Sequence, residues 1–187
     1  MARTLNAVEV SGSTSYDIEF SICTLVTDAN LYKKMQESLR QSGFSDKICE
    51  FLYIDNREIN QGDGFSGLNR ALNQARGRYA ILCHQDIIAI DSVEELRKII
   101  AELDRDDPSW AVLGNAGFDR DHQPYFYLNE QSTVIVGKPR QEPRQVESLD
   151  ENFLLIKQDS RLGFSYDLSG FHLYGADIVS QAKIRGF

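Results

Sequence analysis

The sequence lacks the features that mark a membrane protein, a secreted protein or a disulfide-bonded scaffold. It has no run of about 18 apolar residues, and residues 1–17 have no apolar core like that of a secretory leader. Its three cysteines, Cys23, Cys49 and Cys83, are far apart, and each lies in or beside an apolar run. We therefore expect buried thiols, no transmembrane segment and a cytoplasmic protein, with peripheral association with a membrane left open.

Positive charge is also scarce. The 187 residues include 20 Lys and Arg against 28 Asp and Glu, which gives a formal net charge of −8. Because a nucleic-acid groove requires the opposite balance, we expect no nucleic-acid partner. The basic cluster Lys138, Arg140 and Arg144 is interrupted by Glu142, which is typical of a solvated loop, although a phosphate contact is the alternative.

Several common site signatures are missing. The sequence has no Gly-X-Gly-X-X-Gly motif, no phosphate loop ending in Gly-Lys-Ser/Thr, no Gly-X-Ser-X-Gly elbow and no Cys-X-X-Cys pair. These absences argue against a dinucleotide fingerprint, a P-loop, a serine hydrolase and a structural zinc site. The length is that of one compact domain, which would bury roughly 70% of the surface of the unfolded chain.

The first half of the sequence alternates between strand and helix patterns. Residues 18–26 form an apolar, β-favouring run, and Leu31, Met35 and Leu39 then recur every fourth residue. Asp28 is placed to cap this helix and Gly43 to end it. The pattern predicts a strand followed by a helix.

The alternation then repeats along the chain. We predict buried strands at 51–54, 79–83 and 110–113, a helix at 65–75 ended by Gly77, and a helix from Ser92 with Glu95 in a capping box. Such alternation predicts an α/β fold with a largely parallel sheet covered by helices on both faces. The second half is less regular, with hairpin-like runs at 125–128 and 133–136, a loop at 139–143, a strand at 153–156 and a closing helix at 176–185.

Polar residues follow the predicted strands, where ligands bind in open parallel sheets. The most informative group is His84-Gln85-Asp86, because apolar Ile87 and Ile88 follow it directly. Mg²⁺ or Mn²⁺ binds through one or two carboxylates plus substrate phosphates, which suits Asp86. The alternative is that Asp86 or Asp91 caps the helix near Ser92, and spacing alone leaves both open.

His172 and Asp177 form a second candidate pair, at the entrance to the last helix. They could supply a metal ligand and a proton acceptor. Alternatively, Asp177 interacts with the helix N-terminus, and His172 packs among its apolar neighbours.

Read in order, these motifs resemble those of family 2 glycosyltransferases of the GT-A fold. The resemblance is to the branch with His-Gln-Asp in place of the metal-binding Asp-X-Asp, and it runs from about residue 18 to the end. The segments that carry it are Phe20–Cys23, Tyr53–Asn56, Gly67–Leu72, Ala75–Asp86, Ser148–Lys157 and Gly170–Asp177.

The resemblance implies a UDP- or GDP-linked sugar donor bound across the strand ends. Its implied nucleotide contacts are Val26, Thr27, Asp55, Asn69 and Gln85. Asp86, with His172 as a further ligand, would hold the Mn²⁺ or Mg²⁺ that bridges the diphosphate. Residues 18–115 would form the nucleotide-binding half and residues 116–187 the acceptor and catalytic half of one domain, preceded by a loose tail or edge segment at 1–17. A C-terminal extension beyond residue 187 is left open.

The resemblance also implies an inverting transfer to a glycan, polysaccharide or glycoconjugate. Asp177 is the nearest match to the family's base, and Asp150 is a second candidate. Gly175 departs from the pattern, since relatives usually have an acidic residue there. The alternative is a non-catalytic donor-binding or scaffold module. A nucleotidyltransferase would normally have a Gly-rich, basic loop after the first strand, which residues 25–29 lack.

Overall fold

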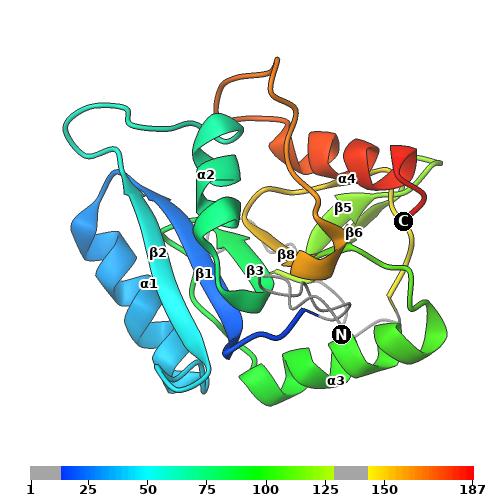
Figure 1. Ribbon diagram of the computed structural model, residues 1–187, viewed down its shortest axis with the longest axis horizontal. Helices are drawn as coiled ribbons and strands as arrows, with labels where there is room; N and C mark the ends of the chain where they lie inside the picture. The colour runs from blue at the N-terminus through cyan, green and yellow to red at the C-terminus, as the bar shows by residue number, and fades with distance from the viewer. Residues whose placement is uncertain (1–13, 129–142) are drawn as a thin grey trace, which may run out of the picture.

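The protein is built around a five-stranded sheet. The computed structural model describes residues 14–128 and 143–187. The strand order is β2-β1-β3-β8-β4 (Figure 1). The strands are β1 (Ile18–Val26), β2 (Cys49–Asp55), β3 (Gly77–Cys83), β4 (Val112–Gly114) and β8 (Phe153–Lys157).

Strand direction confirms the predicted sheet. β1 pairs in parallel with both β2 and β3. β8 comes from the second half of the chain and lies antiparallel between β3 and β4. Because β4 is antiparallel to β8, it runs in the same direction as β1, β2 and β3, so the sheet is largely parallel as expected and only β8 is reversed.

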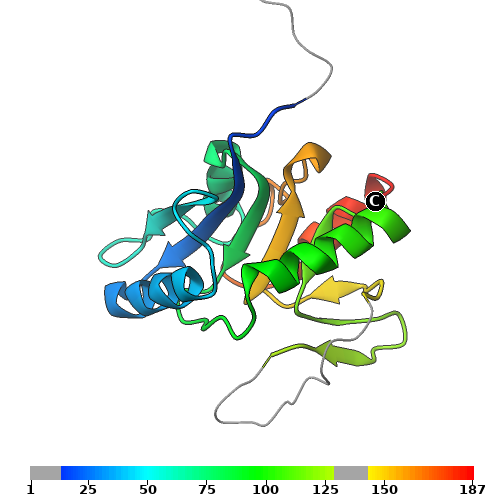
Figure 2. The same cartoon turned by 90° about the horizontal axis from the view of Figure 1, so that it is seen from below.

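Two helices cover each face of the sheet (Figures 1 and 2). α1 (Ala29–Gln41) and α3 (Val93–Asp106) pack on one face, and α2 (Ser66–Gln74) and α4 (Tyr174–Ile184) pack on the other. A short 3₁₀ helix, η1 (Gln158–Ser160), follows β8. None of the helices in the described ranges combines the length and apolar character needed to span a bilayer.

Alternation along the strands produces two separate cores. In β3, Tyr79 and Ile81 face α1 and α3, whereas Ala80 and Leu82 face α2 and α4. All four side chains are almost completely buried. A central strand with apolar residues on both faces lets one sheet hold a helical layer on each side. The three cysteines are buried and free, as expected.

The predicted helix caps are confirmed. The Asp28 carboxylate accepts hydrogen bonds from the backbone N–H groups of Asn30 (2.7 Å) and Leu31 (3.1 Å), and Gly43 has a left-handed φ of 97°. Ser92 caps α3 by accepting from Glu95 N–H at 3.4 Å. The alternative in which Asp86 or Asp91 caps this helix is therefore wrong.

Two local predictions need correction. α2 ends at Gln74 because Ala75 is extended, and Gly77 is the first residue of β3. A Cβ on Gly77 would lie 2.6 Å from the backbone of Phe20 and Ser21, so the glycine permits β1 and β3 to approach. The fourth strand is 112–114, and Trp110 is buried before it, stacked on Tyr79 with ring centroids 6.1 Å apart.

The second half adds a small antiparallel sheet, with strand order β6-β5-β7. Its strands are β5 (Ala116–Phe118), β6 (Pro124–Phe126) and β7 (Ser148–Leu149). The predicted run at 125–128 thus overlaps β6. The run at 133–136, most of the 139–143 loop, Lys138, Arg140 and most of the 1–17 tail lie outside the described residues. The strand at 153–156 and the closing helix are confirmed.

Candidate functional site

The carboxyl ends of β1, β2 and β3 bring several predicted residues together. Val26 and Asp55 are partners in the β1–β2 register. The Gln85 Oε1 atom accepts hydrogen bonds from the N–H groups of Thr27 and Asp28, both at 2.8 Å, and Gln85 Nε2 donates to Thr27 Oγ1 at 2.7 Å. We call Thr27, Asp55, Gln85 and Asp86 the strand-end site.

Asp55 has a charged partner of its own. Arg57 donates from Nε to Asp55 Oδ1 (2.8 Å) and from Nη2 to Oδ2 (2.6 Å). The hydrogen bonds from Arg57 lower the pKa of Asp55 to about 2. The carboxylate is therefore ionised at neutral pH, but its charge is paired at the protein surface.

Asp86 differs from Asp55 because it is exposed and its carboxylate takes part in no hydrogen bond or ion pair among the described residues. The backbone around it is anchored on both sides of the site. The side chain of Gln85 holds β1, and His84 N–H donates to Asn152 O at 3.0 Å. Asp86 thus presents an available carboxylate on a fixed segment.

Tyr174 connects this segment to the start of α4. His84 Nε2 and the Tyr174 hydroxyl are 3.2 Å apart, and that hydroxyl donates to the carbonyl oxygen of Glu151 at 3.3 Å. Tyr174 is buried, and burial raises its pKa, followed by the charges of Glu151 and Asp150. The phenol therefore remains a neutral hydrogen-bonding group.

His172 is exposed, so it does not pack among its apolar neighbours; Phe171 and Leu173 are exposed as well. Its segment is tied to the loop before α2, because Gly170 N–H donates to Asp63 Oδ2 (3.0 Å) and Gly64 N–H donates to Gly170 O (2.8 Å). This leaves the His172 side chain accessible.

Asp63 joins the start of α2 to the segment before α4. Besides Gly170, its carboxylate accepts from the N–H groups of Phe65 and Ser66 and from the Ser66 hydroxyl. Burial would raise the pKa of Asp63, but these hydrogen bonds outweigh it and lower the pKa to about 2. Sequence reasoning missed this residue, although an Asp just before a helix is a capping signal.

The two candidate bases have partners in the protein. Asp177 lies in the first turn of α4, where its carboxylate accepts from the Ser165 hydroxyl (2.6 Å) and the Ser165 N–H (2.8 Å). Asp150 is exposed and accepts from Asn152 N–H at 2.8 Å. Asp177 therefore holds the loop that carries Ser165, and its role as a base stays a prediction.

Asn69 also has a structural position. It is 6% exposed, and its amide donates to Phe164 O and accepts from Phe164 N–H, both at 2.8 Å. Because both polar atoms of the amide are paired within the core, the nucleotide contact expected for Asn69 does not fit its environment.

The donor set at the strand ends is a sparse one for a metal. In residues 14–128 and 143–187, no three His, Cys, Asp or Glu side chains gather in a way that could hold a metal ion. Asp86 and His172 offer one carboxylate and one imidazole. The Asp86 carboxylate fits an ion whose remaining ligands come from a phosphate-bearing substrate and water, which is the usual arrangement for Mg²⁺.

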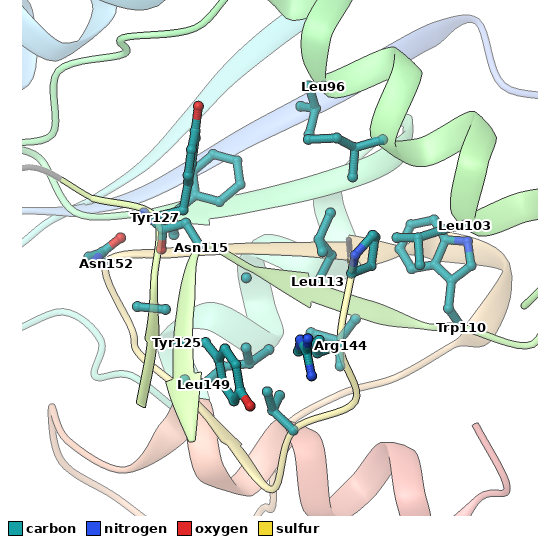
Figure 3. Close-up of a pocket in the computed structure, with 18 of the residues that line it drawn as sticks. Leu96, Leu103, Trp110, Leu113, Asn115, Tyr125, Tyr127, Arg144, Leu149 and Asn152 are labelled. Atoms are coloured by element: carbon teal, nitrogen blue, oxygen red, sulfur yellow. The ribbon is translucent and has the colours of Figure 1, made fainter. Parts of the chain in front are cut away.

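A groove of about 1790 Å³ lies beside the strand-end site, between α3, β4, the small sheet and α4 (Figure 3). Leu96, Leu103 and Trp110 line it from one side. The guanidinium of Arg144 lies over the ring of Tyr125, 5.3 Å from the ring centroid. Asn115 Oδ1 is buried there without a hydrogen-bond partner among the described residues. The groove thus offers a ligand an unsatisfied amide oxygen directly after β4.

Comparison with solved structures identifies the fold. The chain superposes on S. aureus TarS 1–349 with a TM-score of 0.54 at 15% identity, covering 90% of this chain and 56% of that one. A longer TarS structure gives a TM-score of 0.56 at 15% identity, covering 90% of this chain and 34% of TarS. TarS 1–349 in complex with UDP-GlcNAc gives 0.55 at 14% identity, with 90% and 54% covered.

These structures are GT-A glycosyltransferases, so the chain has the GT-A fold predicted from its sequence. It spans about half the length of TarS 1–349.

No protein-family model matches the sequence. One curated protein does match: it is 40% identical over 178 residues, which cover 89% of this chain and 70% of the relative. That protein is "ATP synthase subunits region ORF 6" of Fuscovulum blasticum, a name that states no activity. At this identity and coverage, the chain belongs to the same family as the Fuscovulum blasticum ORF 6 protein.

Proposed function

We propose that this protein transfers a sugar from a nucleoside-diphosphate sugar, UDP- or GDP-linked, to a glycan, polysaccharide or glycoconjugate acceptor. The observation that carries the proposal is the strand-end site, where Gln85 fixes the end of β1 and leaves Asp86 unpaired beside it. The GT-A fold supports it, since TarS, which shares that fold, has been solved with UDP-GlcNAc.

In this proposal, the nucleotide lies across the ends of β1 and β2. Thr27 and Asp55 contact the base, and Gln85 contacts the ribose; the side chain of Val26, expected as a further contact, is only 2% exposed and packs in the core instead. Gln85 already donates to Thr27, so its Nε2 has one remaining hydrogen for this contact.

Asp86 and His172 would hold a divalent cation, Mn²⁺ or Mg²⁺, in the manner of the His-Gln-Asp variant of the Asp-X-Asp motif. When bound, that ion would neutralise charge on the departing diphosphate. Asp86 suits this role because its carboxylate is exposed and has no competing cation among the described residues.

Transfer in this proposal inverts the anomeric centre. The acceptor oxygen forms a bond to the anomeric carbon, the bond from that carbon to the diphosphate oxygen breaks, and a carboxylate takes the acceptor proton. The groove beside α3 offers the acceptor a path to this point, because Asn115 and Asn152 line it where β4 ends and β8 begins.

A second candidate function is a donor-binding module without turnover. Two observations favour it: both carboxylate oxygens of Asp177 accept hydrogen bonds from Ser165, and Gly175 stands where relatives usually have an acidic residue. The two functions differ in one measurable property, which is the release of free UDP or GDP from the bound sugar donor.

Titration calorimetry with UDP and GDP, each with and without Mn²⁺ or Mg²⁺, tests the proposal. We expect metal-dependent binding that falls about 100-fold in Asp86→Ala, while Asp91→Ala, an exposed aspartate of the same loop, binds like wild type. Absence of binding by the wild type would overturn donor recognition. Unchanged binding by Asp86→Ala would overturn the metal role.

Release of UDP or GDP from the matching sugar donor distinguishes the two candidate functions. Metal-dependent release supports transfer, and binding without release supports the donor-binding module.

A further inference from the structure

We propose that Glu151, in the turn between β7 and β8, is the base that takes the proton from the acceptor. This inference rests on the proposed function, and it assigns a residue that neither the sequence motifs nor the resemblance singled out. It starts from the way α4 packs against this turn.

Gly175 allows α4 to begin directly against the turn. A Cβ at position 175 would lie 2.1 Å from the carbonyl oxygen of Leu149, so no other residue fits without displacing backbone. The same Cβ position lies 3.4 Å from Cγ of Glu151. The side chain of Glu151 therefore lies alongside Gly175, at a distance of ordinary van der Waals contact from the position of a Cβ there.

The turn is held from two sides. The Tyr174 hydroxyl donates to the Glu151 carbonyl oxygen, and His84 N–H donates to the Asn152 carbonyl oxygen. His84 also contacts Tyr174 through Nε2 at 3.2 Å. These contacts fix the backbone of Glu151 and Asn152 against His84, two residues before Asp86, so the turn is held to the segment that carries the proposed metal ligand.

Most carboxylates around the strand ends are already used. Each of five aspartates accepts hydrogen bonds that fix local structure: Asp28, Asp55, Asp63, Asp150 and Asp177. Among the described residues, no hydrogen bond or ion pair involves the carboxylate of Glu151, which is half-buried. Both carboxylate oxygens of Glu151 are therefore open to a proton from the acceptor, whereas Asp150 already accepts through Oδ1.

In the assigned step, an oxygen lone pair of the acceptor hydroxyl attacks the anomeric carbon and its proton passes to Glu151. The electron pair of the broken carbon–oxygen bond leaves with the diphosphate. Water can replace the acceptor in a slow hydrolysis that needs the same proton transfer. Azide can also attack, but it carries no proton, so its reaction does not need the base.

The test uses UDP-GlcNAc or GDP-mannose with Mn²⁺, whichever nucleotide the wild type binds, and measures nucleotide release to water and to azide. In Glu151→Gln, we expect hydrolysis to fall about 100-fold, azide to restore release, and nucleotide affinity to stay within about twofold. Asp91→Asn is the control, because this exposed carboxylate has no assigned role in binding or transfer.

Other outcomes decide against the assignment. If Glu151→Gln hydrolyses the donor at the wild-type rate, Glu151 is not the base and the proposed function stands. The same conclusion follows if hydrolysis is lost in Asp150→Asn or Asp177→Asn but not in Glu151→Gln. If azide does not restore nucleotide release in Glu151→Gln, Glu151 has a structural role and is not the base. If the wild type binds the sugar donor but releases no nucleotide from it, both the assignment of the base and the proposed transfer are overturned. If the wild type does not bind nucleotide, the proposed donor site itself is overturned.

Discussion

The two ends of the same parallel strands use polar residues in opposite ways. At the amino ends, Ser21, Glu50, Arg76 and Gly77 satisfy one another: Ser21 Oγ donates to Glu50 Oε1 (2.7 Å) and accepts from the N–H groups of Arg76 (3.0 Å) and Gly77 (2.8 Å). At the carboxyl ends, Gln85 holds the backbone while Asp86 and Glu151 remain without partners among the described residues.

This difference separates polar groups that stabilise the fold from those available to a ligand. A buried group must be paired within the protein, whereas a group reserved for a substrate is left unpaired until the substrate arrives. Substitutions at the amino ends should therefore reduce stability, and substitutions at the carboxyl ends should reduce binding or turnover.

The largest effect on stability is expected for Gly77→Ala. The added methyl group would lie 2.6 Å from the backbone of Phe20 and Ser21, so β1 and β3 would have to separate. We expect a loss of about 3 kcal/mol in the free energy of unfolding, measured by urea denaturation. Arg78→Ala, at the exposed next position, serves as the control. Equal stability of the two variants would contradict close approach at Gly77.

A smaller loss is expected for Ser21→Ala. Ser21 is completely buried, and its removal leaves two N–H groups and the Glu50 carboxylate with one partner fewer. The expected cost is about 2 kcal/mol. Ser66→Ala, which removes an exposed hydroxyl, should cost less in the same urea assay. A neutral Ser21→Ala would mean that water replaces the hydroxyl.

The pH dependence of stability gives a third comparison. Burial by itself would raise the pKa of Glu50, but hydrogen bonds from Arg76 and Ser21 outweigh it and lower the pKa. The stability contributed by Glu50 is thus complete above its unfolded pKa and is lost as the pH falls through its lower folded pKa.

We therefore expect Glu50→Gln to be less stable than wild type at neutral pH and to lose less stability on acidification below about pH 4. Urea midpoints measured across this range test the prediction. If the urea midpoints of the two proteins change in parallel with pH, Glu50 is not the source of the loss of stability in acid.

The smallest stability effect is expected at the opposite end, for Asp86→Asn. Its side chain is exposed and unpaired among the described residues, so the urea midpoint should not change. Substantial destabilisation would mean that Asp86 has a structural role and would remove the contrast between the two ends.

Much of this fold follows from local sequence patterns. The bounds of β1, the cap at Asp28 and the strand beginning at Phe153 agree with the expectations from periodicity and capping. The direction and place of β8 do not follow, because an apolar run indicates burial without specifying its neighbour. The three-residue strands of the small sheet are too short for a periodic signal.

The site was predictable to the same extent. The strand-end rule placed Thr27, Asp55 and Gln85 together because each lies at or just after the carboxyl end of a strand of the parallel part. The pairing of Asp177 with Ser165 depends on how the loop before α4 folds back, which no spacing reveals. The position of Glu151 against Gly175 likewise arises from packing between two distant segments.

The antiparallel insertion of β8 also determines the order in which the sheet can be completed. During synthesis, the apolar edge of β3 is available from residue 83 onward, but its partner strand begins only at residue 153. β4 is made in the interval and must wait as well, since it pairs with β8. A nascent chain therefore exposes a long, unpaired strand edge for much of its elongation, and truncations before residue 157 should aggregate.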